Sequence, residues 1–141
     1  MRRITIVVTA TVVAGLLCAA FALASTTVWN AKLSASQETP PTGVAAAKGT
    51  FHGTVKGTTL KWRLTFSGLT GPATAAHIHM GVKGKAGPVV VPLCAPCTSP
   101  VTGKAKLTSA LMKAFKAHQL YVNVHTMKNP NGEIRGQLKK G

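Results

Sequence analysis

Acidic residues are nearly missing from this chain of 141 residues. Glu38 and Glu133 are its only carboxylate side chains, against 17 lysines and arginines, and the formal net charge is +15. Catalysis by paired carboxylates needs two acids close together, and these two are far apart in sequence. No Ser or Cys nucleophile lies in a recognisable motif, and the Gly-rich segment 81–87 does not join a strand to a helix as phosphate-binding loops do. We therefore do not expect a hydrolase or a nucleotide-binding enzyme, and whether the protein is an enzyme at all stays open.

Aromatic side chains are also few, at 5% of the residues. The lysines are scattered singly and are not interleaved with aromatic rings, as a platform for single-stranded nucleic acid would require. A surface of this charge attracts polyanions in general. We expect anionic envelope or cell-surface material as a partner, and no specific nucleic acid.

Long apolar runs are confined to the first residues. Arg2 and Arg3 precede an apolar stretch from residue 4 to 23, and Ala22-Leu23-Ala24 places small residues at the cleavage positions of an export signal. We predict a cleaved signal peptide over residues 1–24, followed by a single domain over 25–141. Loss of the two arginines lowers the formal charge to +13. The expected location is secreted, periplasmic or on the cell surface.

Two other interpretations of this segment stay open. The apolar run is almost long enough to span a bilayer, so an uncleaved signal could act as an anchor and would be the only membrane contact. Cys18 raises the alternative of a lipid anchor, but Leu17 is bulky where a small residue is expected.

Cysteine is scarce, with three in the whole chain. Without Cys18, the pair Cys94 and Cys97 remains, and in an oxidising compartment such a pair can close a small disulfide loop. A redox or metal role is the alternative. Redox thiolates usually lie at a helix N-terminus, whereas here prolines surround the pair and no helical pattern follows. We predict a structural disulfide.

Alternation of apolar and polar residues dominates the rest of the chain. Leu60, Trp62, Leu64 and Phe66 alternate with polar residues, which is typical of a strand with one buried face. Similar patterns predict strands around 51–55, 75–80, 89–93, 120–126 and 133–138. A short helix is predicted within 108–118, where Thr108 could act as the N-cap. Many short strands and one helix indicate an antiparallel sandwich or barrel.

Two of these strands carry histidines on their polar side. In the strand 75–80, Ile78 and Met80 point to the core, so His77 and His79 point outward. In 120–126, the same alternation turns His125 outward, together with Tyr121 and Asn123. If the strands are neighbours, three imidazoles share one patch.

Three neutral imidazole nitrogens suit copper or zinc and leave a fourth position open. Glu133, across the hairpin, could orient His125 without binding the metal itself, or pair with Arg135 on the same strand face. The alternative is a solvated polar face without function. His52 and His118 are assigned to the surface.

Three segments resemble a known family. They are LSASQETPP (33–41), TAAHIHMG followed by GPVVVPL (74–93), and LYVNVHTMKNPNGEIRGQL (120–138). Together they look like the CHRD domain, first described in chordin, over about Ala31 to Leu138. The resemblance implies an all-β fold, an antiparallel Greek-key immunoglobulin-like sandwich or barrel with one short helix, and some similarity to copper/zinc superoxide dismutases. The family implies no settled activity.

The dismutase similarity gives a further expectation for the histidines. His77 and His79 match the His-x-His copper pair of those enzymes, His125 could be the third ligand, and the loop from 81 to 100 could cover the site. The zinc ligands of the dismutases have no counterparts here. The expected function is an extracytoplasmic binding or structural module of unknown ligand. The alternative is a mononuclear copper-binding protein, with dismutase activity as a more remote option.

Overall fold

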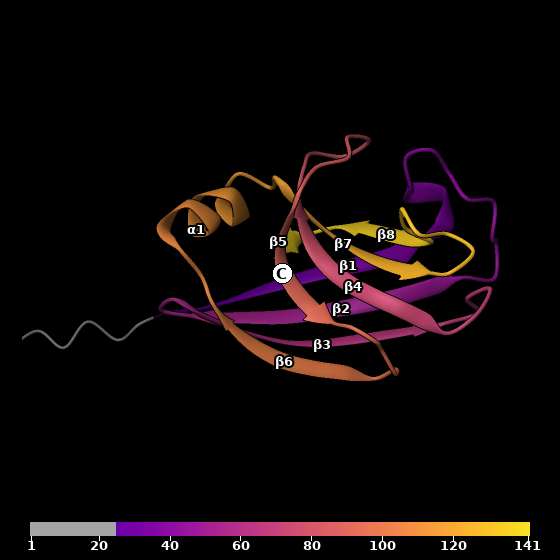
Figure 1. Ribbon diagram of the computed structural model, residues 1–141. Helices are drawn as coiled ribbons and strands as arrows, with labels where there is room; N and C mark the ends of the chain where they lie inside the picture. Colours follow the sequence, from indigo (N-terminus) through magenta and orange to yellow (C-terminus); the bar gives the residue numbers. More distant parts are fainter. Residues whose placement is uncertain (1–24) are drawn as a thin grey trace, which may run out of the picture.

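The computed structural model describes residues 25–141, so the predicted signal over 1–24 lies outside the described residues. The described chain is mostly β-structure with one α-helix (Figure 1). Its elements are β1 (Thr26–Ser34), a 3₁₀ turn η1 (Ala35–Gln37), β2 (Lys48–Lys56), β3 (Thr59–Ser67), β4 (Ala73–Met80), β5 (Val89–Cys94), β6 (Val101–Lys106), α1 (Ser109–Lys116), β7 (Leu120–Thr126), β8 (Ile134–Gln137) and β9 (Lys139–Lys140).

The strands form one antiparallel sheet in the order β5-β4-β7-β8-β1-β2-β3-β6, and β9 pairs with β1. The end strands β5 and β6 contact each other, so the sheet curls into a nearly closed barrel. This arrangement confirms the predicted antiparallel β-architecture with one short helix.

Alternation fills the barrel interior as the sequence predicts. Leu60 and Leu64 of β3, Ile78 of β4, and Val122 and Val124 of β7 are all fully buried. Burial of apolar side chains of this size contributes roughly 1.5–3 kcal/mol each to folding. These residues form the core against which both halves of the sheet pack.

Strands β1 and β6 were not predicted. In β1, Trp29, Ala31 and Leu33 alternate inward, a signal that the sequence does contain. In β6 the inward positions include Gly103, whose missing side chain leaves room for the Trp62 ring: an added Cβ would lie 2.3 Å from it. Small inward residues weaken the apolar alternation, which explains why β6 was missed.

The helix and the disulfide both follow the predictions. The Thr108 Oγ1 accepts a hydrogen bond from the Leu111 N–H at 3.2 Å, and Phe115 packs on Trp29 with ring centroids 5.1 Å apart. Cys94 and Cys97 lie at disulfide distance, with sulfurs 2.01 Å apart. No helix within residues 25–141 has the length and hydrophobicity needed to cross a membrane.

Candidate metal centre

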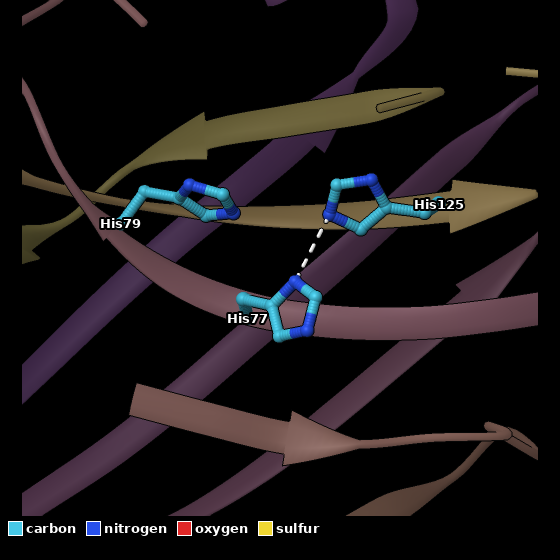
Figure 2. A group of neighbouring side chains, drawn as sticks. All are labelled: His77, His79 and His125. Atoms are coloured by element: carbon cyan, nitrogen blue, oxygen red, sulfur yellow. Dashed lines mark hydrogen bonds between the residues drawn. The ribbon is translucent and has the colours of Figure 1, made fainter. Parts of the chain in front are cut away.

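Neighbouring strands bring the three predicted histidines together. Strands β4 and β7 pair so that Ala75 lies opposite His125, two residues from His77. One ring nitrogen from each of His77, His79 and His125 lies within 4.8 Å of the other two. Figure 2 shows the three imidazoles gathered over one face of these strands.

Backbone carbonyls orient two of the three rings. The Nδ1 of His79 is 2.9 Å from the Gly87 carbonyl oxygen, and the Nδ1 of His125 is 2.9 Å from that of Pro130. A carbonyl only accepts, so in each neutral ring the proton is on Nδ1 and the lone pair is on Nε2. The Nε2 of His79 is buried and has no hydrogen-bond partner.

The third ring completes the set through its other nitrogen. The Nδ1 of His77 is 3.1 Å from the Nε2 of His125 (Figure 2). Because the Nε2 of His125 carries a lone pair, His77 is the donor in the metal-free protein. Moving this proton to the Nε2 of His77 would leave three lone pairs converging on one point.

Burial keeps all three imidazoles neutral. Burial, reinforced by the neighbouring His125 and His79 rings, lowers the pKa of His77 to about 4. Burial also lowers the pKa values of His79 and His125, and it outweighs their hydrogen bonds to Gly87 and Pro130. Neutral imidazole is the form that ligates a metal.

We call the side of β4 and β7 that carries His77, His79 and His125 the histidine face; most of it is buried, and His77 is half-buried. His79 and His125 are each 8% exposed, and Asn123 is 2% exposed, although all three point away from the core. Segments 35–42, 81–88 and 127–133 cover this side of β4, β7 and β8 (Figure 1). The covering segment reaches only residue 88 of the predicted cover 81–100, since β5 begins at Val89.

Arg135 fastens the covering segment 81–88 to the sheet. Its guanidinium donates to the carbonyl oxygens of Val82 and Lys85, both at 2.9 Å. It also lies 3.5 Å over the centre of the Tyr121 ring, which in turn stacks on His79 at 4.9 Å. Arg135, Tyr121 and His79 thus form one stack, which restricts the orientation of the His79 ring.

Glu133 has a different role from the predicted one. Its carboxylate accepts hydrogen bonds from the Thr70 N–H, the hydroxyls of Thr70 and Thr126, and the Asn129 amide. It bonds neither His125, whose Nδ1 is directed to Pro130, nor Arg135. Burial raises the pKa of Glu133, but these hydrogen bonds outweigh burial and lower it. Glu133 therefore ties the 127–133 segment and Thr70 together.

A second buried carboxyl lies on the histidine face. The Asn123 side-chain amide donates to the Glu38 Oε1 at 2.5 Å, and Asn123 lies between His77 and Arg135 in the strand register. Burial raises the pKa of Glu38 to about 7, although Arg135 opposes this rise. Sequence patterns missed Glu38 because it follows the η1 turn and belongs to no alternating strand. Alternation did place Tyr121 outward, but it could not show what covers this side chain.

The donor set fits a small transition-metal ion. Two nitrogens on one tetrahedral ion with bonds of 2.0–2.1 Å lie roughly 3.3 Å apart, close to the 3.1 Å between His77 and His125. The set of three is wider, within 4.8 Å, so closure on an ion would bring the ligand nitrogens closer by at most roughly 1.5 Å. The buried, unpaired Nε2 of His79 is a polar atom that a metal bond would satisfy.

The comparisons with known proteins identify the family. The CHRD domain family model matches residues 29–138. This match covers most of the chain and confirms the resemblance carried by the three motifs, so the chain belongs to the CHRD domain family. No curated protein and no solved structure matches the chain.

Proposed function

We propose that this CHRD-domain protein binds one metal ion, copper foremost, through His77, His79 and His125. The observation that supports the proposal is the convergence of three neutral imidazoles, two of them fixed by backbone carbonyls, around the unpaired Nε2 of His79. Hydrogen bonds from the second ring nitrogen to a carbonyl are the usual outer partners of metal-binding histidines.

The ligand types favour copper or zinc over other ions. All three donors are imidazole nitrogens, with no thiolate or carboxylate among them, and copper is the divalent ion that such donors hold most tightly. With three protein ligands, a bound ion keeps an open position for water or a small molecule. Two features of the fold stay predictions within this proposal. They are the Greek-key immunoglobulin-like connectivity and the similarity to dismutase barrels. The missing zinc ligands favour copper binding without dismutase activity.

Calorimetric titration with copper and zinc tests the proposal. We expect the purified, oxidised protein to bind copper one-to-one, and a His77→Ala, His79→Ala double variant to lose that binding. The matched control is His52→Ala, His118→Ala, which removes two exposed imidazoles outside the cluster and should leave binding unchanged. Binding that the double variant retains would contradict the proposal.

A spectroscopic readout separates ligand loss from misfolding. Nitrogen hyperfine structure in the electron paramagnetic resonance spectrum of the copper form should report three imidazoles, and a single His125→Asn variant should report two. Circular dichroism of each metal-free variant checks that the β-fold is retained. A copper spectrum with unchanged nitrogen coupling in His125→Asn would place the ion elsewhere.

We further propose that the protein acts outside the cytoplasm as a module attracted to anionic envelope material, with residues 1–24 as a cleaved signal and 25–141 as the single domain. CHRD membership suggests an extracellular-type module. Both carboxylates, Glu38 and Glu133, are buried, whereas every lysine in residues 25–141 is exposed. Mass spectrometry of the exported protein tests processing: the expected mature chain begins at Ser25, and an intact first segment would favour the anchor.

A further inference from the structure

We infer that the outer face of β1, β2, β3 and β6 is a binding surface for a linear, phosphate-rich polyanion. The inference rests on the second proposed role, attraction to anionic material, and is independent of the metal centre. We call this surface the basic face. Its cations, all exposed, are Lys32, Lys48, Lys56, Lys61, Arg63, Lys104 and Lys106.

The strand register gathers lysines that are scattered in the sequence. In β2 and β6 the even-numbered residues point outward, and in β3 the odd-numbered residues do, because the residues between them are buried or half-buried against the core. Lys61 of β3 lies directly opposite Lys104 of β6. Thr59 of β3 lies between Lys56 of β2 and Lys106 of β6, opposite both. Lysines far apart in the chain therefore share one surface, with neighbouring strands about 4.8 Å apart.

The pairing of Lys61 with Lys104 is unfavourable for the isolated protein. Like charges directly opposite on neighbouring strands destabilise a sheet, and Arg63 adds a third cation two residues along β3. No carboxylate offsets them, since Glu38 and Glu133 are both buried. A polyanion laid across the face would supply the missing counter-charges, and its binding would release condensed counterions.

Hydroxyl groups and shallow hollows lie between the cations. Lys56 and Lys61 border a hollow of about 360 Å³ that Thr26, Thr54 and Thr59 also line. Farther along the face, a second hollow of about 540 Å³ lies between Lys32 and Lys48 and includes Thr50 and Thr65. Threonine hydroxyls donate hydrogen bonds to phosphate oxygens. In the second hollow the Thr50 and Thr65 hydroxyls bond to each other at 2.7 Å, which leaves one hydroxyl hydrogen free beside the two lysines.

The composition of the face favours a flexible polymer over a bilayer or a nucleic acid. The large apolar side chains exposed in residues 25–141 are Val82, Val89 and Met127, and none lies on the basic face, so it has no apolar anchor for a membrane. It has no exposed Phe, Tyr or Trp ring on which bases could stack; its one exposed ring is the His52 imidazole, whose Nδ1 lies 2.8 Å from the Asn30 Oδ1. Four strands span roughly 14 Å, wider than the roughly 12 Å major groove of duplex DNA.

Binding to long-chain inorganic polyphosphate tests the inference. The purified protein is titrated at several salt concentrations against a variant of the basic face, Lys61→Gln, Arg63→Gln, Lys104→Gln, Lys106→Gln. The matched control removes the same charge elsewhere: Lys83→Gln, Lys85→Gln, Lys113→Gln, Lys116→Gln. Each lost phosphate contact should lower the slope of log affinity against log salt by roughly 0.7, so the face variant should lose a slope of roughly 3 and at least about tenfold in affinity.

The outcomes distinguish two questions: whether the protein binds an anionic polymer, and whether it does so through the basic face. A loss confined to the face variant supports the basic face, whereas equal losses in both variants would overturn it and leave net charge as the cause. No binding of polyphosphate by the unmodified protein would overturn both the inference and the anionic-partner role. Tighter, face-dependent binding to phosphatidylglycerol vesicles or to duplex DNA than to polyphosphate would overturn the choice of polymer. Circular dichroism checks that both variants fold.

Discussion

The two halves of the barrel use the same alternation with opposite results. In β3, the outward residues Lys61 and Arg63 are exposed to solvent. In β7, the outward residues Tyr121, Asn123 and His125 are almost as buried as the core residues between them. The difference arises because segments 35–42, 81–88 and 127–133 cover β4, β7 and β8 but not β2, β3 and β6.

Burial beneath these segments changes what a polar side chain can do. We call β4, β7 and β8 the covered half and β2, β3 and β6 the open half. In the covered half, each buried polar group needs a partner within the protein, as Glu133 finds in Thr70, Thr126 and Asn129. In the open half, water satisfies the lysines, and their charges act on whatever approaches from solution. The covered half is therefore suited to hold a small ion, and the open half to bind an extended polyanion.

The largest expected effect is in the covered half. Replacing Glu133→Ala removes the acceptor shared by the buried Thr126 hydroxyl and the more exposed donors of Thr70 and Asn129, so the free energy of unfolding should fall by about 3 kcal/mol. Urea denaturation measures this loss. The matched change in the open half, Arg63→Ala, should cost less than about 0.5 kcal/mol, because the side chain is exposed. Equal losses would mean that cover does not distinguish the two halves.

A pH-dependent effect comes next. Burial raises the pKa of Glu38 to about 7 from its ordinary value of 4.5, so between these pH values the folded protein binds more protons than the unfolded chain. This contribution to stability is complete below pH 4.5 and is lost as the pH rises through about 7. Glu38→Gln mimics the protonated form and should remove that loss.

Urea midpoints at pH 4 and pH 7.5 measure the effect of Glu38→Gln. The variant should match the unmodified protein at pH 4 and be the more stable of the two at pH 7.5. The pH 4 comparison is the internal control. A difference of the same size at both pH values would show that the substitution acts through packing and not through the charge.

The smallest expected effect is in the open half. Lys61→Gln removes the like-charge pair with Lys104 and should raise the free energy of unfolding by about 0.2–1 kcal/mol, less so at high salt. Lys113→Gln is the matched control: this lysine lies in the last turn of α1, where a cation is favourable, so its loss should be slightly destabilising. Destabilisation by Lys61→Gln would show that the pair is not repulsive in its setting.

Much of this architecture can be predicted from alternation. Strands β2, β3, β4, β5 and β7, the capped helix and the outward direction of His77, His79 and His125 all follow from local patterns, because one buried face imposes period two. The short His-x-His spacing and the family motifs identified the histidines that the structure brings together.

Other features depend on contacts between distant segments and could not be predicted. Alternation says on which side of the sheet Asn123 lies, but not that Glu38, 85 residues earlier, covers it. The lysines of the basic face are scattered along the sequence. The pairing of β6 with β3 brings them together, and the sequence does not predict that pairing. The predicted role of Glu133 was wrong because the turn before β8 directs its carboxylate to Thr70 and not to His125.

The strand order also constrains when the chain can fold. β1, the first strand of the described chain, lies between β2 and β8, with Ser34 opposite Arg135, and β9 pairs Lys140 with Trp29. Contacts this distant in sequence slow folding, because a long loop must close before they form. During synthesis, a chain of this topology cannot complete its sheet until its last strands have emerged from the ribosome.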